Sequence, residues 1–245
     1  MPAKHCESAV VIENQPVADG IFRMVAWWPY PVQAGQFFMV RGWDRFPLLS
    51  RPISVHDADG ERVVFLYEVR GEGTRLLSEK KPGETVLLSG PAGNGFPTGQ
   101  IQGKVAVVSG GIGIAPLLLT VKALSGCAVT LCCGFRDKSY GLDAFRPYVQ
   151  EIRVATDSGK EGHKGFVTDL LDPADFDAVI TCGPEVMMEK LARDCIAKQV
   201  VCYVSMERHM ACGVGACLGC THHTAHGAKC VCKDGPVFRG EELYA

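Results

Sequence analysis

The stretch KVAVVSGGIGIAP, residues 104–116, decides the fold of the second half of this 245-residue chain. It begins with a short, continuous apolar run, as expected for a strand that is buried on both faces of a parallel sheet. Two glycines and Pro116 then interrupt the run, which indicates a tight turn and the first turn of a helix. Exposed backbone N–H groups at such a turn can bind a pyrophosphate. The stretch therefore predicts a dinucleotide site around Gly110, Gly111 and Gly113.

Further strand-like and helix-like segments follow this stretch. Buried parallel strands are expected at 104–110, 128–135, 151–156 and 178–184, and the intervening helices at 114–125 and 185–199. Such an alternation is typical of an α/β domain. A purely structural glycine turn is the alternative at this point, because Pro116 stands where the full dinucleotide fingerprint has its third glycine. The same proline and the glycines break the apolar run at 105–121, so we expect no membrane span there.

The N-terminal part of the chain has a different pattern. From residue 8 to about residue 98, short apolar segments alternate with turns, which is typical of an antiparallel barrel or sandwich. From about residue 206 the chain is rich in Cys, Gly, Ala and His. We therefore expect an α+β multidomain protein. It would have an antiparallel β-barrel at 1–98, an α/β parallel-sheet domain at 99–205 and a small cysteine module at 206–245.

Composition excludes several classes of protein. Hydrophobic residues make up 47% and charged residues 21% of the chain, as in ordinary globular domains. A net charge of -2 and the lack of a basic run disfavour nucleic acid as a partner. The N-terminus lacks the pattern of a secretory signal, so we expect a cytoplasmic protein. In a reducing cytoplasm, the 12 cysteines are better explained as metal ligands or buried thiols than as disulfides.

Five of these cysteines lie close together near the C-terminus. Cys212, Cys217 and Cys220 have the spacing C-x4-C-x2-C of plant-type [2Fe–2S] ligation, and Cys230 or Cys232 can supply a fourth thiolate. The small residues between them allow the backbone to wrap around inorganic sulfurs. Zinc is the main alternative, because CLGC is also a C-x2-C knuckle. Strand alternation would place residues 230 and 232 on one face, so geometry alone does not choose between them.

The remaining histidines and cysteines have simpler explanations. His222, His223 and His226 are expected in an exposed loop, since four thiolates already suffice for a cluster. Cys132, Cys133 and Cys195 fall in predicted strands or helices and are expected to be buried apolar residues.

Three motifs in order give the chain a family resemblance. RPIS at 51–54, SGGIGIAP at 109–116 and CGPEVMM at 182–188 resemble the ferredoxin reductase superfamily over nearly the whole chain. The resemblance implies that FAD binds in the barrel and NAD in the α/β domain. It places Cys182 near the nicotinamide, with no acid, base or nucleophile role, because hydride transfer depends chiefly on aligned rings. No catalytic side chain is assigned.

The same resemblance implies a set of FAD contacts. They are Arg51, Pro52, Ile53, Ser54, Leu66, Tyr67, Glu68, Gly73 and Thr74. The guanidinium of Arg51 would bind the diphosphate, and the hydroxyl of Ser54 would approach the reactive edge of the flavin. Ile53 replaces the tyrosine of many relatives, so ring stacking at that point is lost. Gly73 and Thr74 would help to bind the diphosphate.

A closer resemblance comes from the cysteine module. ERHMACGVGACLGC at 207–220 and VCKDGPVF at 231–238 resemble the electron transfer subunits of dihydroorotate dehydrogenase, as do GHKGFVTDLL at 162–171 and GFR at 134–136. The resemblance selects Cys232 as the fourth ligand. It implies transfer of electrons from the FMN of a separate catalytic subunit through [2Fe–2S] and FAD to NAD+, in a heterotetramer of two plus two subunits.

Two alternatives remain at this point. A related FAD/[2Fe–2S] subunit could serve a hydrogenase, a sulfide dehydrogenase, a glutamate synthase or a transhydrogenase, because such subunits share the three-part layout. A non-redox nucleotide-binding protein with a structural zinc is the other. An absorption spectrum that shows neither flavin nor iron would favour the zinc protein.

Overall fold

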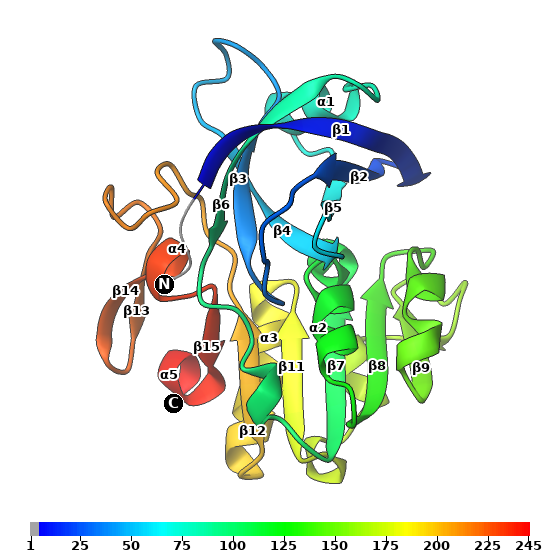
Figure 1. The fold of residues 1–245 in the computed structure, drawn as a ribbon. Helices are drawn as coiled ribbons and strands as arrows, with labels where there is room; N and C mark the ends of the chain where they lie inside the picture. The colour runs from blue at the N-terminus through cyan, green and yellow to red at the C-terminus, as the bar shows by residue number, and fades with distance from the viewer. Residues whose placement is uncertain (1–4) are drawn as a thin grey trace.

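A computed structural model describes residues 5–245 and shows a β-barrel above an α/β sheet (Figure 1). The barrel is closed, with the strand order β1-β2-β5-β4-β3-β6, and each neighbouring pair is antiparallel. Its strands are β1 (His5–Ala18), β2 (Ile21–Trp27), β3 (Phe37–Arg41), β4 (Arg51–Ala58), β5 (Arg62–Glu68) and β6 (Thr85–Ala92). The helix α1 (Glu72–Ser78) connects β5 to β6. The predicted barrel is thus confirmed.

Aromatic side chains fill the barrel. Trp28, Phe38 and Phe65 are almost completely buried. The ring of Phe38 meets Trp28 edge to face with centroids 4.8 Å apart, and it meets Phe65 in the same way at 5.7 Å. Edge-to-face contacts of this kind place the positive ring edge against the negative ring face. The apolar residues of the short N-terminal segments thus pack together in one closed core.

The second half of the chain forms a seven-stranded sheet with the order β10-β9-β8-β7-β11-β12-β15. All pairs are parallel except β12 with β15. The strands are β7 (Lys104–Gly110), β8 (Ala128–Phe135), β9 (Glu151–Thr156), β10 (His163–Lys164), β11 (Ala178–Cys182), β12 (Val201–Ser205) and β15 (Val237–Arg239). The four predicted parallel strands are present, whereas β10, β12 and β15 were not predicted.

Helices cover both faces of this sheet. In β7, Val105 and Val107 pack in one core with α2 (Leu117–Ala123), and Ala106 and Val108 pack in another with α3 (Glu185–Ala197). A strand buried on both faces explains the continuous apolar run in the sequence.

Single 3-10 turns link the elements of the α/β half. They are η1 (Thr98–Gln100), η2 (Gly111–Ile114), η3 (Leu142–Ala144), η4 (Arg146–Tyr148), η5 (Val167–Leu170) and η6 (Pro173–Asp175). The apolar run at 105–121 is divided by η2 into a strand and a helix, as predicted. Within residues 5–245, no helix combines the length and the apolar character needed to cross a bilayer.

The C-terminal segment lies beside the barrel strand β6 and the sheet strand β12 (Figure 1). It contains a hairpin of β13 (Thr221–Thr224) and β14 (Gly227–Cys230), then α4 (Val231–Asp234), β15 and α5 (Gly240–Tyr244). Through β15 it adds the antiparallel edge strand of the large sheet, and α5 packs on α3.

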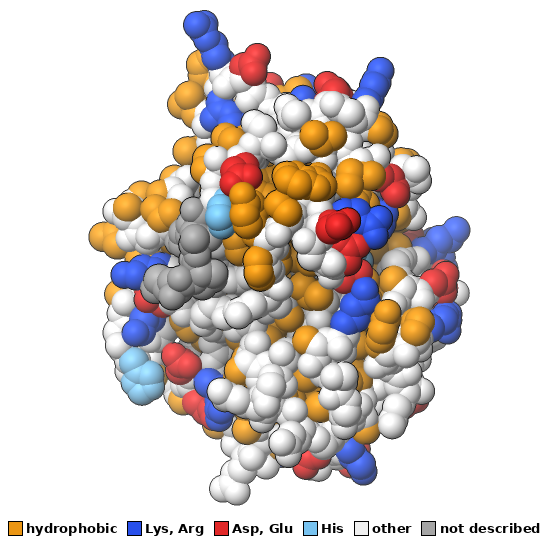
Figure 2. Space-filling model, in the orientation of Figure 1, with side chains coloured by type: hydrophobic (Ala, Val, Ile, Leu, Met, Phe, Trp, Pro, Cys, Tyr) orange, Lys and Arg blue, Asp and Glu red, His pale blue; other side chains and the backbone are white. Residues whose placement is uncertain are grey.

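On the face drawn in Figure 2, charged side chains do not gather in a large patch of one sign. Figure 2 shows acidic and basic side chains scattered over one face, with hydrophobic side chains gathered over the barrel. Exposed residues on the barrel strands include Val10, Ile12 and Trp27.

Candidate cofactor sites

The first candidate site lies where β4 begins. The guanidinium of Arg51 rests against Gly73 in α1, so that a Cβ on Gly73 would come within 2.7 Å of Arg51 Nε. The Arg51 guanidinium also lies over the Trp43 ring, 5.4 Å from its centroid. The structure therefore brings together Arg51 and Gly73, which the sequence resemblance assigned to one diphosphate.

The turn before α1 offers further anion-binding groups. The hydroxyl of Thr74 accepts hydrogen bonds from the backbone N–H of Arg70 at 2.9 Å and from that of Gly71 at 3.2 Å, which fixes the turn. The first helical bond runs from Arg75 N–H to Gly71 O at 2.9 Å. The three N–H groups before Arg75 have no partner within the helix, as at any helix start. Together with the cation of Arg51 they form a donor set that fits a diphosphate.

The rest of the RPIS motif runs along β4. Pro52, Ile53 and Ser54 are half-buried and pair with Met39, Phe38 and Phe37 of β3, respectively. Ser54 thus lies on a strand whose backbone is fixed on both sides by the barrel, which suits a hydroxyl that must meet a ligand at a fixed position.

The LYE segment of β5 is arranged differently. The side chain of Leu66 is buried in the core shared with the α/β half, and Tyr67 is buried in the barrel, where its hydroxyl donates to Asn14 Oδ1 at 3.1 Å. Burial raises the pKa of Tyr67. Glu68 pairs with Arg70 at 2.6 Å. Because the side chains of Leu66 and Tyr67 point into the two cores, these residues can contact a flavin only through their backbone groups.

The two predicted NAD motifs are packed against one another. A Cβ on Gly113 would lie 2.3 Å from the carbonyl oxygen of Cys182, so only glycine fits at this position. Gly110 ends β7 and Gly111 begins η2 with a φ of +54°. The carboxyl ends of β7 and β11 are therefore joined directly, at the point where the strand order reverses and where dinucleotides bind in open α/β sheets.

Cys182 itself is fully buried at the end of β11. Burial raises the pKa of its thiol, and the nearby carboxylate of Glu207 raises it further. The thiol is therefore protonated and unreactive at neutral pH. This agrees with a packing role beside the nicotinamide rather than with acid–base chemistry.

Glu207 was not singled out from the sequence. The residue is exposed overall, but desolvation of its carboxyl group raises the pKa of Glu207, while Arg70 opposes that shift and Glu68 adds to it. The carboxyl group is therefore within electrostatic range of the end of β5 and, as the raised pKa of Cys182 indicates, of that thiol. Only the folded chain brings residues 68, 70, 182 and 207 together.

The cysteine loop holds a second candidate site. Backbone contacts link the four cysteines in two pairs: the N–H of Cys217 donates to the Sγ of Cys212, and the N–H of Cys232 donates to the Sγ of Cys220, each at 3.4 Å. A [2Fe–2S] cluster takes two protein thiolates at each iron. Within residues 5–245, no group of three or more His, Cys, Asp or Glu side chains is arranged for a single metal ion.

Backbone N–H groups point at these sulfurs. Val214, Ala216 and Cys217 donate to the Sγ of Cys212 at 3.3 to 3.4 Å, and Gly215 donates to the Sγ of Cys232 at 3.1 Å. The donors lower the pKa of Cys212 to about 6. These donors stabilise the thiolate of Cys212, whereas burial raises the pKa of Cys232. Backbone N–H groups directed at sulfur are the donor chemistry that an iron–sulfur cluster requires.

Cys230 and Cys232 do not lie on one strand, so the strand alternation expected from the sequence does not extend over both. Cys230 ends β14, where its Sγ lies 3.9 Å from Thr221 Oγ1, while Cys232 lies in α4 and its N–H donates to the Sγ of Cys220 at 3.4 Å. The chain turns from strand to helix between the two cysteines. The contact with Cys220 favours Cys232 as the fourth ligand, and the assignment stays a prediction.

The cysteine loop packs directly on the flavin barrel. A Cβ on Gly213 would lie 2.5 Å from Met39 Cγ, and Met39 is the β3 partner of Pro52 in the RPIS motif. Cys220 and Cys232 belong to the same apolar cluster as Met39. One side chain therefore separates the loop of the thiols from the strand of the predicted flavin site.

The other predicted cysteines and histidines can also be placed. Cys132, Cys133 and Cys195 are completely buried, as predicted. His226 lies in the exposed turn of the β13–β14 hairpin, as predicted, whereas His222 and His223 lie on β13. His223 is exposed, and His222 is half-buried, with its Nδ1 2.9 Å from Arg208 Nη2. Arg208 in turn pairs with Glu185 at 2.8 Å. This chain of contacts ties the hairpin to the start of α3, so His222 has a structural partner that the sequence did not reveal.

Comparisons with known proteins agree with this arrangement. Residues 207–244 match the family model of the iron–sulfur cluster binding domain of dihydroorotate dehydrogenase B. The electron transfer subunit of dihydroorotate dehydrogenase B (NAD+) from Clostridium acetobutylicum is 48% identical over 233 residues, which cover 95% of each chain. The subunit of the same name from Clostridium perfringens is 44% identical, over 95% of this chain and 96% of the other. The chain belongs to the family of dihydroorotate dehydrogenase B electron transfer subunits.

Solved structures extend the comparison. A chain from the NADH-dependent reduced ferredoxin–NADP oxidoreductase superposes with a TM-score of 0.86 at 31% identity, covering 96% of this chain and 89% of that one. A flavohemoglobin from Malassezia yamatoensis with bound FAD and heme superposes with a TM-score of 0.67 at 17% identity, covering 80% and 57%. The latter shares the fold alone. Membership of the dihydroorotate dehydrogenase B family confirms both resemblances drawn from the sequence.

One exposed aromatic residue at the carboxyl edge of the sheet was missed in the sequence. Phe166 is 72% exposed, although Val167 beside it is buried against Gly134 at the end of β8. The Phe166 N–H donates to Asp169 Oδ2 at 3.0 Å, which fixes the backbone. The segment GHKGFVTDLL contained a signal for this exposure. A phenylalanine that directly follows a glycine at the end of a strand has no neighbouring apolar residues in the sequence before it, so burial in the core was not the obvious expectation.

Proposed function

We propose that this chain is the electron transfer subunit of an NAD-dependent dihydroorotate dehydrogenase, acting in pyrimidine biosynthesis. Electrons would pass from the FMN of a separate catalytic subunit through [2Fe–2S] and FAD to NAD+. The observation that carries the proposal is the contact of the cysteine loop with Met39, beside the RPIS strand. A short path between a cluster and a flavin is what an electron transfer subunit needs.

The cofactors supply the redox chemistry of this chain. FAD exchanges a hydride with NAD and single electrons with the cluster, which converts two-electron chemistry into one-electron steps. The protein contributes binding and orientation. Arg51, Gly73 and Thr74 would hold the diphosphate, and Ser54 would orient the reactive edge of the flavin. Cys212, Cys217, Cys220 and Cys232 would hold the irons.

The α/β half would bind NAD along the carboxyl edge of its sheet. The pyrophosphate would lie at the η2 turn and the nicotinamide at Cys182, above β11. Phe166 lies on the other side of the turn, near β8 and β9, about 10 to 15 Å from β11 at the usual strand spacing. An exposed ring that is fixed there offers a stacking surface to the adenine.

The finer details of the assembly belong to the same proposal. The partner would be an FMN-containing catalytic subunit, in a heterotetramer of two plus two, and the thiol-rich chain would work in the cytoplasm. The chain would divide into a flavin domain at 1–98, a nicotinamide domain at 99–205 and a cluster module at 206–245.

The structural similarity to the ferredoxin–NADP oxidoreductase supports one alternative. A FAD/[2Fe–2S] subunit of another NAD(P)H-dependent complex would use the same three sites with a different partner. The deciding experiment is copurification from the native host, followed by cofactor analysis and an assay of NAD+-dependent dihydroorotate oxidation. A copurified partner without this activity would favour the alternative, and a complex without flavin or iron would contradict both.

A further inference from the structure

The strand that carries the RPIS motif contains a β-bulge at His56. The β4–β5 pairing steps from Val55 opposite Phe65 to Asp57 opposite Val64, so β4 has one extra residue at this point. Bulges re-aim a side chain and recur next to active sites. His56 follows Ser54 by two positions, and only 4% of it is exposed. A polar side chain is therefore buried close to the predicted flavin site by a local irregularity of the strand.

The bulge directs His56 out of the barrel and into the α/β half. Its Nδ1 lies 2.8 Å from the carbonyl oxygen of Ala115, and its ring meets that of Phe145 edge to face at 6.3 Å. Because a carbonyl oxygen only accepts, Nδ1 carries the proton and donates. Ala115 directly follows η2, the turn predicted to bind the NAD pyrophosphate. His56 thus connects the flavin strand to the NAD turn through one hydrogen bond.

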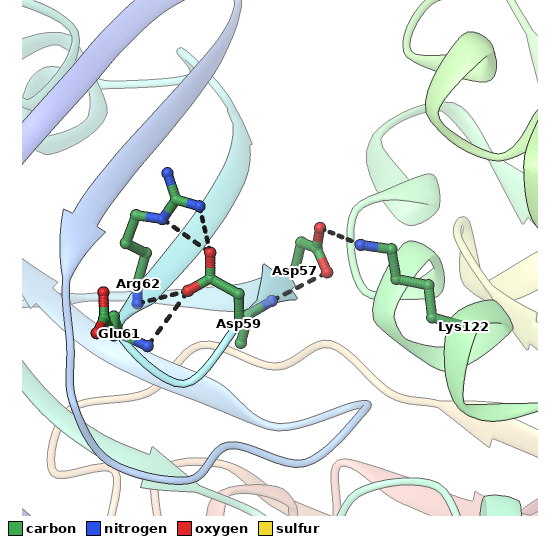
Figure 3. A network of polar contacts seen from close by, with 6 residues as sticks. Asp57, Asp59, Glu61, Arg62 and Lys122 are labelled. Atoms are coloured by element: carbon green, nitrogen blue, oxygen red, sulfur yellow. Dashed lines mark hydrogen bonds and ion pairs between the residues drawn. The ribbon is translucent and has the colours of Figure 1, made fainter.

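The next residue makes a second connection. Asp57 Oδ2 lies 2.6 Å from the Nζ of Lys122 in α2, and Figure 3 shows this ion pair crossing from the barrel to the helix. The side chains of Asp57 and Lys122 are only 22% and 30% exposed, so solvent screens the pair less than it screens a surface pair. Ala115 lies just before α2 and Lys122 lies in its last turn, so the two contacts hold the helix near both of its ends.

Apolar packing alone leaves this interface incompletely filled. Ile21 and Leu66 of the barrel share a core with α2, and beside that core an open pocket of about 260 Å³ lies between the two halves, lined by His56, Lys122 and others. Apolar contacts are non-directional, so they do not by themselves fix an angle. The directional contacts of His56 and Asp57 are therefore the ones that can fix the angle between barrel and sheet.

We propose that His56 and the Asp57–Lys122 pair are positioning residues, which fix the NAD turn relative to the flavin strand for hydride transfer. The inference rests on the proposed function. In the proposed direction a hydride leaves FADH2 for NAD+, so that NAD+ is reduced to NADH and the flavin, which releases one proton to water, is oxidised to FAD. The test runs the same transfer in reverse, from NADH to FAD, with one proton taken from water. Ring stacking must be right within about 1 Å, since a misplacement of that size can cost on the order of 100-fold in rate.

The test measures flavin reduction by NADH in the cofactor-loaded subunit with stopped-flow absorption. We expect His56→Leu and Lys122→Met to keep full FAD content and to slow hydride transfer by roughly tenfold or more. The long-wavelength charge-transfer absorption of stacked flavin and nicotinamide should weaken with it. His56→Gln should restore most of the rate, because its amide can still donate to Ala115 O.

The β4–β5 turn provides a matched control. Asp59 and Arg62 form an ion pair within the barrel, close to Asp57 but without contact to α2 (Figure 3). Asp59→Asn should therefore leave hydride transfer at the wild-type rate. If His56→Leu misfolds and loses its FAD, the positioning role is tested by Lys122→Met alone. Lys122 lies on the partly exposed side of the interface.

The outcomes separate the two levels of inference. A wild-type subunit that NADH does not reduce contradicts the proposed function. A wild-type subunit that is reduced, with Lys122→Met and His56→Leu reduced equally fast and with unchanged charge-transfer absorption, overturns the positioning role. An equal loss in His56→Gln and His56→Leu also overturns it, because the hydrogen bond to Ala115 would then not be the cause.

Discussion

Acid should weaken the fold of this chain through His56, and the size of the effect can be worked out. Burial lowers the pKa of His56 from about 6.5 to about 4. Asp57 opposes this shift, while Arg23 and Lys122 add to it. The unfolded chain therefore binds a proton at a higher pH than the folded chain does. The stabilisation is complete above pH 6.5 and is lost as the pH falls towards 4.

The full pKa difference corresponds to about 3 kcal/mol, of which about 1 kcal/mol is lost between pH 7 and about pH 5.5. For a chain of this length, 1 kcal/mol shifts the melting temperature by about 2 to 4 °C. His56→Gln keeps a donor for Ala115 but cannot titrate. We therefore expect the wild type to lose about 2 to 4 °C more than His56→Gln over this pH range, because all other titrating groups are common to both.

The assay is a thermal melt of the cofactor-loaded subunit at several pH values, followed by tryptophan fluorescence. His226→Gln is the control, since His226 lies exposed on the β13–β14 hairpin, and its pH curve should parallel that of the wild type. If His56→Gln also parallels the wild type, His56 is not buried as a neutral ring, and the reasoning from its packing fails.

Three further predictions concern the cofactor sites. Cys232→Ser should lose the cluster while Cys230→Ser largely keeps it, as measured by iron content; the opposite result would reverse the ligand assignment. Arg51→Ala should weaken FAD binding roughly 10- to 100-fold, in proportion to lost charge-assisted hydrogen bonds, as titration of the apoprotein with FAD would show; undiminished affinity would contradict its diphosphate role. Phe166→Ala should raise KM for NADH roughly tenfold with kcat unchanged, and Phe166→Tyr should restore it; an unchanged KM would remove the adenine from this ring.

The elements that sequence alone could predict are those specified by near neighbours. In GGIGIAP, glycines and a proline within a few positions determine where β7 ends and α2 begins, and the structure has this order. The binding groups of RPIS could also be predicted, because the Arg51 cation, the Ser54 hydroxyl and the extended backbone between them all lie within four residues. Arg51 and Gly73 could be assigned to one site only by resemblance, since 22 residues separate them in the sequence and only the barrel brings them into contact.

The elements that were missed depend on distant pairing. The segment VCYVS of β12 lies in a short apolar run, VVCYV at 200–204, so part of its signal was local. Its place in the sheet comes from the pairing of Val201–Ser205 with Ala178–Cys182 of β11. Three residues of β15 are a strand only through their register with β12. The bulge at His56 is also invisible locally, because it is defined by which residue of β5 lies opposite. Tertiary contacts decide such features, and a single sequence does not contain them.

The choice between Cys230 and Cys232 shows how a local signal can be overlooked when the wrong periodicity is applied. A period of two would hold only if β14 continued through residue 232. Asp234 prevents this, because its Oδ2 accepts the backbone N–H of Cys230 at 2.7 Å and so caps a helical turn that begins at Val231. The turn brings Cys232 to Cys220 and leaves Cys230 beside Thr221. An aspartate four residues after the first cysteine, followed by Gly-Pro, is therefore the feature of VCKDGP that favours Cys232 as the fourth thiol, since it determines where the strand stops.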